Sequence, residues 1–581
     1  MKIEKKIKYL IQDAFKSKFK ILISLKFIKL YLTSKKFIGS YTFVIFSFVK
    51  KLKLNPIAIG NTIGKFLKDN SFFINNFIIV KGFLNIIIKN KYLIKQLKYT
   101  IDGNFFINKK KKILVEFSSP NTNKPLHIGH LRNIFLGDSI SKILKFIGHK
   151  IYKVNLVNDR GIHISKSMIA YQKFGNNTNP GALGIKGDHF VGQYYIKFEK
   201  EYRKELFKNN FKKSLLLFEA RGMLKKWELK NKYILDLWNK MNNWVYQGFN
   251  NTYRKININF DRIYYESQTY LLGKEIVING LEKNIFYKKK DNSVCVDLKK
   301  EGFGEKVLLR SNETSLYITQ DLGTIEMRHK DYNFNKLIYI VGNEQKHNFD
   351  VLFKILNKLN KNYAVYHLSY GMVNLPNGKI QSRKNNFVDA DFLIKKIVFS
   401  VKLYINLSKK NNFFLKEKDK IYNIIGIGAL KYFFLKVLPK NDLLFNPKLS
   451  ISLNGNTAPF IQYTYVRIFS MLKNINKKFF LWNNFFISDL DDLHFLEKKI
   501  IIKICNFYKK LKEASQNYSP YVIVKYLFEL TKLYNTMYGQ LSILHIKNNK
   551  KKKFRIYLSY IIIKMIKVNM RLLGIELPNK M

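Results

Sequence analysis

The sequence predicts an α/β protein in which a mainly parallel sheet is flanked by an N-terminal α/β module and a C-terminal bundle of helices. Three observations support this fold class. A strand, a loop, a helix and a second strand follow one another between residues 113 and 157, which is the order of a parallel unit. A long helical stretch then interrupts the sheet, and the chain after residue 391 is almost wholly helical. We therefore divide the chain into residues 1–108, 109–390 and 391–581, with a helical insertion at about 176–260 in the middle part.

The N-terminal part alternates helical and strand-like segments. Tyr41–Val49 is rich in aromatic and β-branched residues, which predicts a strand, and Val80–Lys89 has the same character. Between them, Asn55–Lys68 has Pro56 near its start and apolar residues at helical spacing, which predicts a helix. The run of like charges at Lys109–Lys112 is typical of a solvated boundary and separates this part from the next.

The parallel unit begins with a short apolar strand, Ile113–Phe117. Ser118–Lys124 follows with the Ser, Pro and Asn residues of a turn. Helical periodicity then extends over Ile128–Phe146, and we expect Gly148 to end that helix. Val154–Val157 is the next predicted strand.

Strand-like pieces return after the long helical stretch at residues 190–253. They are Val307–Leu309, Leu316–Thr319, Leu337–Val341 and His367–Val373. From about residue 391 the helical pattern continues to 573, which is long enough for an independent bundle. We expect the lysine-rich run at 547–553 to be a solvated loop within it.

Charge and cysteine content restrict the class of protein. Lys and Arg number 104 against 40 Asp and Glu, and the resulting net charge of +64 attracts polyanions, nucleic acid first. Because Asn, Ile, Phe and Tyr are also abundant, an A/T-biased genome accounts for most of this excess, and the charge alone is weak evidence. Cys295 and Cys505 lie far apart without a CxxC pair, which excludes a disulfide framework and a cysteine-type zinc site.

We expect no transmembrane helix, because the chain has no uncharged apolar run of about 18 residues or more. Residues 1–50 are basic and apolar, as in a transit peptide. They contain Glu4 and Asp13 and no arginine, which favours the start of a folded domain.

Two histidines stand at the first strand-to-helix turn of the parallel unit, in His127-Ile128-Gly129-His130. Imidazoles there can donate to phosphate oxygens, and the helix N-terminus adds its own N–H groups and partial positive charge. Gly129 lacks a Cβ, so a flat base can pack against its backbone. Two surface histidines or a metal-binding pair remain alternatives, although no third zinc ligand lies close in the sequence.

A basic loop and three polar residues are further candidates. Gly378–Lys384 follows a predicted strand, and its cations can hold the β- and γ-phosphates of ATP, although a simple basic hairpin has the same pattern. Tyr317 and Asp321 can meet a cationic substrate, since a carboxylate accepts two N–H bonds from a guanidinium. Alternatively, Asp321 caps a helix. Glu116, near the end of the first strand, is a second candidate anion.

Five stretches in one order closely resemble the arginyl-tRNA synthetases of class I. The resemblance covers nearly the whole chain, is weakest at residues 1–40 and 480–500, and includes the C-terminal Leu572–Pro578. The five stretches are Phe117–Arg132, Val157–His163, Lys186–Gly192, Tyr317–Asp321 and Asn454–Tyr463. The resemblance implies a Rossmann-type catalytic domain, an N-terminal domain on the tRNA elbow and an all-α, DALR-type anticodon-binding bundle.

For ATP, the resemblance implies roles for two signatures. The HIGH signature falls on residues 127–130, with the histidines on the phosphates and Gly129 against adenine. The KMSKR signature falls on residues 379–383, where Ser382 replaces the penultimate lysine, and Lys124 before HIGH is expected to supply the missing charge. The expected ATP-binding residues are His127, Gly129, His130, Lys379, Ser382 and Arg383, and the expected catalytic residues are His127, His130, Lys124, Lys379 and Arg383.

For arginine, the resemblance implies a polar pocket. Ser119 and Asn121 match positions that hold the α-amino and carboxylate region, and Glu116 matches a side chain that faces the amino acid. Tyr317 and Asp321 match the pair that reads the guanidinium. Gln345 completes the pocket as a further polar wall.

The implied reaction has two steps. Arginine attacks the α-phosphorus of ATP to give arginyl-adenylate, and the 3′-terminal adenosine of tRNA(Arg) then takes the arginyl group. ATP with Mg²⁺ is a substrate, and we expect no bound zinc, metal site or organic cofactor. We expect a cytoplasmic monomer that does not bind membranes, with a plastid or mitochondrial matrix as the alternative compartment. The residues expected to bind tRNA are Gln462, Tyr463, Arg467 and Met581.

Three other functions fit the sequence less well. Another class I synthetase, for cysteine or methionine, is disfavoured by Tyr317 and Asp321 and by the lack of zinc-type cysteines. A non-catalytic tRNA-binding protein is disfavoured by the retained histidines and by Asn121. A zinc-dependent hydrolase built on the histidine pair lacks ligands.

Overall fold

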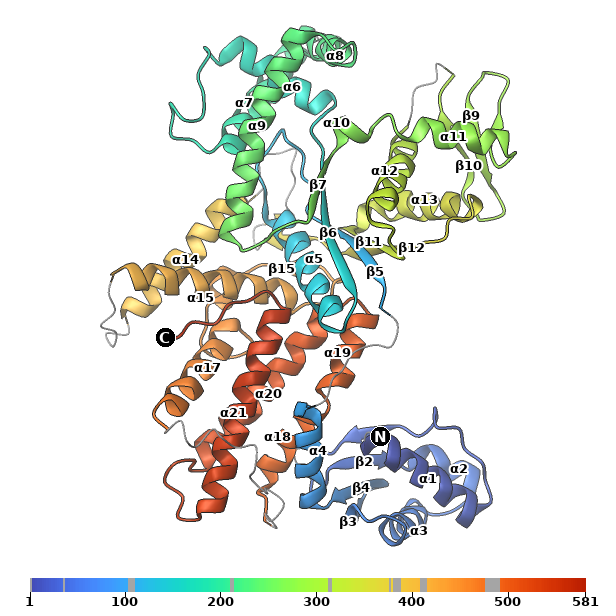
Figure 1. Cartoon of the computed structure of the whole chain (residues 1–581), viewed down its shortest axis with the longest axis vertical. Helices are drawn as coiled ribbons and strands as arrows, with labels where there is room; N and C mark the ends of the chain where they lie inside the picture. The colour runs from blue at the N-terminus through green and yellow to red at the C-terminus, as the bar shows by residue number, and fades with distance from the viewer. Residues whose placement is uncertain are drawn as a thin grey trace. The chain divides into compact units, whose positions relative to one another are not determined.

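The computed structural model describes residues 3–34, 37–102, 110–208, 214–311, 316–375, 378–379, 388–407, 415–475 and 492–581 (Figure 1). The chain forms two compact units. The first unit comprises Met1–Phe105, Arg467–Lys510 and Tyr526–Ile566, and the second comprises Phe106–Val466, Leu511–Lys525 and Lys567–Met581. No helix in the described ranges is long and apolar enough to cross a membrane.

The N-terminal part of the first unit is an antiparallel sheet with helices. Its strand order is β1-β2-β4-β3, and its core contains Phe15, Phe43 and Phe48. The elements are α1 (Ile3–Phe19), β1 (Leu30–Leu32), β2 (Tyr41–Val44), α2 (Phe46–Leu52), α3 (Pro56–Asp69), β3 (Ile74–Val80), β4 (Phe83–Ile88) and α4 (Asn90–Asp102).

Two predictions for this part are confirmed and one is half wrong. Helix α3 begins where Asn55 Oδ1 accepts a hydrogen bond of 2.8 Å from the Ile57 N–H, as its sequence predicts. The second predicted strand corresponds to β4. The first, Tyr41–Val49, ends after four residues as β2, and Phe46 begins α2. A short run of aromatic and β-branched residues is compatible with either a strand or a helix. Here the second half is helical, and Phe48 is the residue of α2 that is buried.

Helices dominate the described chain after residue 390, as predicted. They are α14 (Ala390–Leu407), α15 (Leu415–Leu435), α16 (Pro447–Ser450), α17 (Ala458–Lys473), α18 (Phe495–Cys505), α19 (Phe507–Gln516), α20 (Pro520–Gln540) and α21 (Asn549–Leu572). The expected lysine-rich loop at 547–553 is wrong. Helix α21 starts inside it, because the Asn548 side chain accepts from the Lys551 N–H at 3.1 Å and caps the first turn.

A five-stranded parallel sheet forms the centre of the second unit and confirms the predicted Rossmann-type class. Its order is β12-β11-β5-β6-β7, so β5, the first strand of this sheet along the chain, lies in its middle (Figure 1). The strands are β5 (Lys112–Glu116), β6 (Lys150–Val157), β7 (Arg262–Tyr265), β11 (Lys336–Gly342) and β12 (Ala364–Tyr370). Leu114 and Val115 are fully buried, as expected for a central parallel strand.

Helix α5 (Ile128–Phe146) connects β5 to β6 with the bounds that the sequence predicts. Gly148, just after it, has a φ of +108°, a backbone conformation that favours glycine. Gly137 allows the helix to lie directly against Phe117, because a Cβ there would overlap the Phe117 ring. The N-terminus of α5 is thereby fixed at the carboxyl end of the sheet, where ligands of such folds bind.

Two long connections separate the remaining strands. The first contains α6 (Ile162–Phe174), which was not predicted, followed by the helices of the predicted insertion, namely α7 (Gly187–Lys208), α8 (Leu215–Glu228) and α9 (Lys232–Lys255). The second contains α10 (Glu266–Thr269), α11 (Gly273–Glu282), the antiparallel strands β8 (Tyr287–Lys288), β9 (Val294–Leu298) and β10 (Gly304–Leu309), and α12 (Tyr317–Tyr332).

The predicted strand at Leu316–Thr319 is wrong, because Tyr317 begins helix α12. Such a short apolar run also fits one helical turn, in which Thr319 is buried and donates a hydrogen bond of 2.5 Å to the Leu308 carbonyl. A 3₁₀ turn (Asn343–Gln345) and α13 (Lys346–Lys358) join β11 to β12. After β12, the short strands β13 (Val373–Leu375), β14 (Gly378–Lys379) and β15 (Leu443–Leu444) form a small sheet of order β14-β13-β15.

Candidate active site

His127 and His130 cap the N-terminus of α5 with their own rings. The Nδ1 of His127 accepts from the Gly129 N–H at 3.2 Å, and the Nδ1 of His130 accepts from the His127 N–H at 3.1 Å. The two ring centroids are 3.9 Å apart. Because both Nδ1 atoms are acceptors, the proton of each neutral imidazole lies on Nε2, where it can be donated to a ligand.

Both imidazoles are held in the neutral form. Burial, followed by the nearby charge of Lys124, lowers the pKa of His127 to about 3. Burial together with His127 and Lys124 lowers the pKa of His130 well below its ordinary value. The pair therefore offers N–H donors without bringing positive charge, and Lys124 is the cation beside them.

Lys124 is half-buried just before the signature, and burial lowers the pKa of its ammonium group. An anion would relieve that cost, since a buried cation is stabilised by an opposite charge. The structure thus brings three of the predicted phosphate-binding residues, His127, His130 and Lys124, to one helix N-terminus.

The loop after β5 is fixed by hydrogen bonds to neighbouring elements. The N–H of Ser118 donates to Asn133 Oδ1 at 2.6 Å, and the N–H of Ser119 donates to Asn155 Oδ1 at 2.9 Å. Both serines have positive φ values, 80° and 44°, and the hydrogen bonds to Asn133 and Asn155 on either side hold this strained backbone in place. Asn121 is exposed and its backbone pairs with Asn158 in a parallel bridge. The predicted residues Ser119 and Asn121 are therefore held at the carboxyl end of the sheet.

A group of three carboxyls and one guanidinium lies at the ends of β5 and β7, where Glu116 and Arg328 are buried and Asp321 and Glu266 are partly buried. Glu116 forms an ion pair with Arg328, and both side chains are nearly inaccessible to solvent. Burial, then Glu116 and then Glu266, raise the pKa of Asp321 to about 7, although Arg328 opposes this. Burial raises the pKa of Glu266 to about 7; the charge of Arg160 opposes this shift and Asp159 adds to it. Within the described ranges, neither Asp321 nor Glu266 forms an ion pair, although Arg328 and Arg160 act on them through their charge.

Glu266 and Arg328 were not predicted from the sequence. Glu266 directly follows β7 and Arg328 lies two turns along α12 from Asp321, so only the sheet order reveals that they meet Glu116. The usable signal was position: a carboxylate immediately after a parallel strand faces the ligand edge of the sheet.

Two predicted arginine-binding residues lie at the surface. Tyr317 is 81% exposed at the start of α12, one helical turn before Asp321. Gln345 is exposed in the 3₁₀ turn after β11, where its Oε1 accepts from Asn348 at 2.8 Å. The structure places both on elements that begin near the carboxyl edge of the sheet, and neither side chain contacts the buried acidic group through a hydrogen bond that the described chain shows.

The second signature is described only at its start. The backbone of Lys379 forms the end of β14, and residues 380–387, with the predicted Ser382 and Arg383, lie outside the described residues. The chain that follows pairs with the first signature: Asp389 forms an antiparallel bridge with His127, with Ile128 N–H donating to Val388 O at 3.0 Å. The chain at residues 388–389 therefore lies against the N-terminus of α5, whereas Lys379 pairs with β13.

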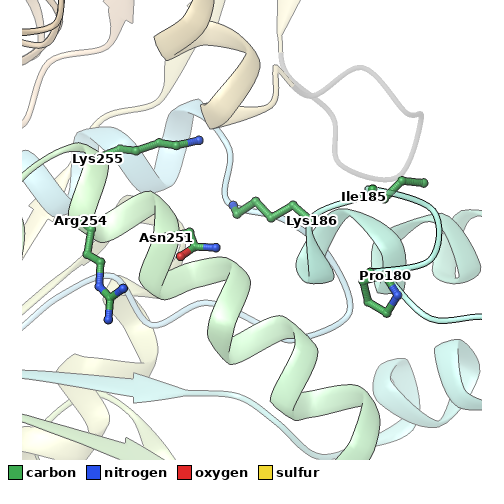
Figure 2. Close-up of a pocket in the computed structure, with 8 residues that line it drawn as sticks. Pro180, Ile185, Lys186, Asn251, Arg254 and Lys255 are labelled. Carbon is green, nitrogen blue, oxygen red and sulfur yellow. The ribbon is translucent and has the colours of Figure 1, made fainter. Parts of the chain in front are cut away.

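A pocket of about 580 Å³ lies between the 180–186 loop and the end of α9 (Figure 2). Figure 2 shows Lys255 extending toward Lys186 at its edge. Beside Lys186, Asp188, His189 and Asp391 lie close enough to one another to share a metal ion. Lys186 Nζ, however, already lies 3.0 Å from Asp188 and 2.5 Å from Asp391, so an ammonium group supplies the cation for these carboxylates.

The four residues predicted to bind tRNA have different surroundings. Gln462 is fully buried and donates to the Glu576 carbonyl at 2.9 Å, whereas Tyr463 is 45% exposed. Arg467 donates to Asn535 at 2.6 Å. Met581 packs on an apolar cluster that contains Val401, Tyr422 and Ile425.

Comparison with known families and proteins assigns the whole chain. The family model "tRNA synthetases class I (R), catalytic domain" matches residues 92–446, "DALR anticodon binding domain" matches 461–581, and "Arginyl tRNA synthetase N terminal domain" matches 2–88. An arginine–tRNA ligase of Amoebophilus asiaticus is 46% identical and one of Bacteroides thetaiotaomicron is 43% identical, each with 100% of both chains covered. The chain belongs to the arginyl-tRNA synthetase family.

Solved structures agree with this family at the level of the fold. The arginyl-tRNA synthetase of Thermus thermophilus has a TM-score of 0.78 at 21% identity, with 100% of both chains covered. That of Plasmodium falciparum has a TM-score of 0.76 at 22% identity, with 100% of this chain and 99% of the other covered. As a member of the arginyl-tRNA synthetase family, the chain is an aminoacyl-tRNA ligase, and the predicted resemblance is confirmed.

Proposed function

We propose that this arginine–tRNA ligase binds the guanidinium of L-arginine at the acidic group formed by Glu116, Glu266 and Asp321. The observation that supports this proposal is that, of these three carboxyls, only Glu116 forms an ion pair among the described residues, with Arg328. A guanidinium would restore charge balance and allow Asp321 and Glu266 to ionise. A smaller amino acid would leave them buried and unpaired, which makes discrimination steep.

The remaining arginine contacts come from the neighbouring loops. Ser119 and Asn121 hold the α-amino and carboxylate region of the substrate. Tyr317 and Gln345 close over the pocket from the starts of their helices. These positions put the substrate carboxylate between the acidic group and the N-terminus of α5, where the α-phosphorus of ATP must lie for attack.

ATP binds at the N-terminus of α5 in this proposal. The Nε2–H groups of His127 and His130 donate to phosphate oxygens, Gly129 lies against adenine, and Lys124 balances the charge of the leaving pyrophosphate. Lys379, Ser382 and Arg383 act from the other side of the phosphates. Mg²⁺ enters with ATP as part of that substrate. Catalysis then depends on positioning and charge stabilisation rather than on a protein nucleophile.

We assign tRNA binding to the flanking parts. Residues 1–108 bind the elbow of tRNA(Arg) and residues 391–581 bind its anticodon, and the catalytic part extends over 109–390. Tyr463 is exposed enough to stack on a base and Arg467 can contact a phosphate. Gln462 and Met581 act by positioning, since Gln462 holds the main chain at Glu576 and Met581 packs on the apolar cluster. The enzyme acts as a cytoplasmic monomer.

ATP–pyrophosphate exchange tests the substrate assignment. Each amino acid is assayed with and without tRNA(Arg). Exchange with arginine alone, and only when tRNA is present, supports the proposal together with the tRNA dependence expected from the resemblance. Exchange with arginine that needs no tRNA keeps the amino acid and rejects that dependence. Folded protein that binds tRNA but shows no exchange with arginine contradicts the proposed substrate.

A further inference from the structure

Arg132, two residues after His130 on α5, is fully buried, and its guanidinium lies in a cage of main-chain carbonyls. Its Nη1 donates to Gly371 O at 2.8 Å and Met372 O at 3.0 Å. Its Nη2 donates to the carbonyls of Leu438, Pro439 and Asn441 at 3.4, 3.1 and 2.6 Å. Burial lowers its pKa to about 10, although Tyr370 and Asp442 oppose the shift.

The five acceptors come from two chain segments that flank one small sheet. Gly371 and Met372 directly precede β13, which pairs with β14 through Asn374↔Lys379. Leu438–Asn441 directly precedes β15, which pairs with β13 through Val373↔Leu443. Arg132 therefore connects α5 to the base of the β13–β14 hairpin. This hairpin ends at Lys379, the first residue of the second signature.

The neighbouring residue attaches the same helix to the amino-acid loop. Asn133 accepts from the Ser118 N–H at 2.6 Å and donates to the Ile340 carbonyl at 2.6 Å. One turn of α5 thus contacts the loop that holds Ser119, the end of β11, and the β13–β14 hairpin. A planar guanidinium suits this task, because its two Nη groups reach both segments at once, which an ammonium group cannot do.

We propose that Arg132 is a positioning residue that sets the β13–β14 hairpin, and with it Lys379, relative to the histidines on α5 during adenylate formation. This inference rests on the proposed contact of Lys379 with ATP. Displacement of a phosphate-binding group by about 1 Å can cost about 100-fold in rate. Loss of the cage therefore reduces the rate of the chemical step rather than the binding of arginine.

The decisive experiment is a double-variant cycle with R132K and K379A, measured by ATP–pyrophosphate exchange in the presence of tRNA. R132K keeps the positive charge but loses the two Nη groups that donate to both segments. We expect its kcat to fall about 100-fold with the KM for arginine unchanged. If Arg132 acts through Lys379, the double variant is no slower than K379A alone. Losses that multiply, or an unchanged kcat in R132K, overturn the proposal.

Asp442 supplies the control for loosening of the small sheet. Its Oδ1 accepts from the Met372 N–H at 2.7 Å, so it joins the same two segments to each other, and its charge also favours the Arg132 cation. D442A removes this hydrogen bond, whereas D442N keeps an Oδ1 acceptor and removes only the charge. Both are expected to lower kcat much less than R132K does. A loss in D442A equal to that in R132K overturns the specific role of Arg132.

Two further outcomes are distinguishable. If K379A exchanges at the normal rate, the proposed contact of Lys379 with ATP is wrong, and the inference about Arg132 falls with it. If R132K does not fold, the cycle is repeated with R132Q. If neither variant folds, Arg132 serves folding only and the positioning role is rejected.

Discussion

The two histidines of the active site use one ring nitrogen for the fold and the other for the ligand. Their Nδ1 atoms accept from backbone N–H groups at the start of α5, which fixes the protons on Nε2. A neutral donor is useful near a cation such as Lys124, since a second positive charge would raise the cost of burial. The same hydrogen bonds therefore decide the tautomer, the ring orientation and the helix terminus.

Substitution of His130 separates these two tasks. Asn at this position can still accept from the His127 N–H through its Oδ1 but has no donor where Nε2 lies, and Ala can do neither. We expect both H130N and H130A to lower kcat of ATP–pyrophosphate exchange by about 100-fold or more. Only H130A should also lose about 1 kcal/mol of stability in chemical denaturation.

The KM for arginine is the internal control for these variants, because His130 lies at the phosphate end of the site. It should stay within a few-fold of the unchanged enzyme in both. Normal turnover in H130N would show that the Nε2–H makes no contribution.

The pKa of Asp321 gives arginine binding a pH dependence. Burial and the neighbouring carboxyls raise it to about 7, so the carboxyl is neutral below that pH and cannot pair with a guanidinium. The KM for arginine should therefore rise as pH falls from 8 to 6, approaching about tenfold per unit for each required ionisation well below pH 7. Steady-state kinetics across this range measures the effect.

Variant D321N identifies the group responsible. It should have a higher KM at pH 8 and a shallower pH dependence, with the remaining slope due to Glu266, whose pKa is also about 7. A KM for arginine that is flat between pH 6 and 8 in the unchanged enzyme would contradict the assignment.

At the scale of elements, the spacing of apolar residues predicted helices and strands that bury one face. It did not predict features that depend on packing between segments far apart in the sequence. The βαβ unit from β5 to β6 was predicted closely, because the HIGH motif marks the start of its helix and Gly148 marks the end. The strand predicted at Leu316–Thr319 is helical in the structure. Four residues are too few to distinguish the periodicity of a helix from that of a strand. Likewise, HIGH was readable as a motif, whereas Glu266 became a site residue only through the order of strands.

The C-terminal bundle contains a buried ion pair that can be tested by stability. Arg555 Nε donates to Glu497 Oε1 at 2.7 Å, and their side chains are 8% and 2% exposed. The Glu497 Oε2 also accepts from the His494 N–H and caps α18. Variant E497A leaves a buried guanidinium without its partner and should lower the free energy of unfolding by about 3–5 kcal/mol.

Urea denaturation followed by circular dichroism measures this loss. K551M is the matched control, because it breaks the ion pair between Lys551 and the 81% exposed Asp492 in the same unit. An exposed pair contributes about 0–1 kcal/mol, so K551M should differ little from the unchanged protein. Equal losses in the two variants would show that burial of the Arg555 pair is not what stabilises α18.

At the scale of the whole molecule, a net charge of +64 acts on any polyanion. Such a field adds affinity for tRNA in general, whereas recognition of tRNA(Arg) depends on particular contacts. The two contributions respond differently to salt, because counterion release follows the number of phosphates contacted and not the base sequence.

We therefore expect cognate and non-cognate tRNA to lose affinity together as salt rises. A plot of log K against log salt concentration should have a steep negative slope, about −0.7 to −0.9 for each phosphate contacted, that is nearly equal for both. Filter binding or fluorescence anisotropy between about 50 and 200 mM salt gives the slopes. A shallow slope for both would mean that the charge is only a product of sequence composition.

The position of β5 in the middle of the parallel sheet has a consequence for synthesis on the ribosome. β5 can pair with β6 early, but its other edge waits for β11, which joins it across 223 residues in the hydrogen bond from Lys112 to Asn335. Until then the nascent chain has an unpaired central strand whose apolar side chains lack cover, which is a route to aggregation. Pauses in translation that fall before β11 should therefore increase the demand for chaperones more than pauses that fall after β12.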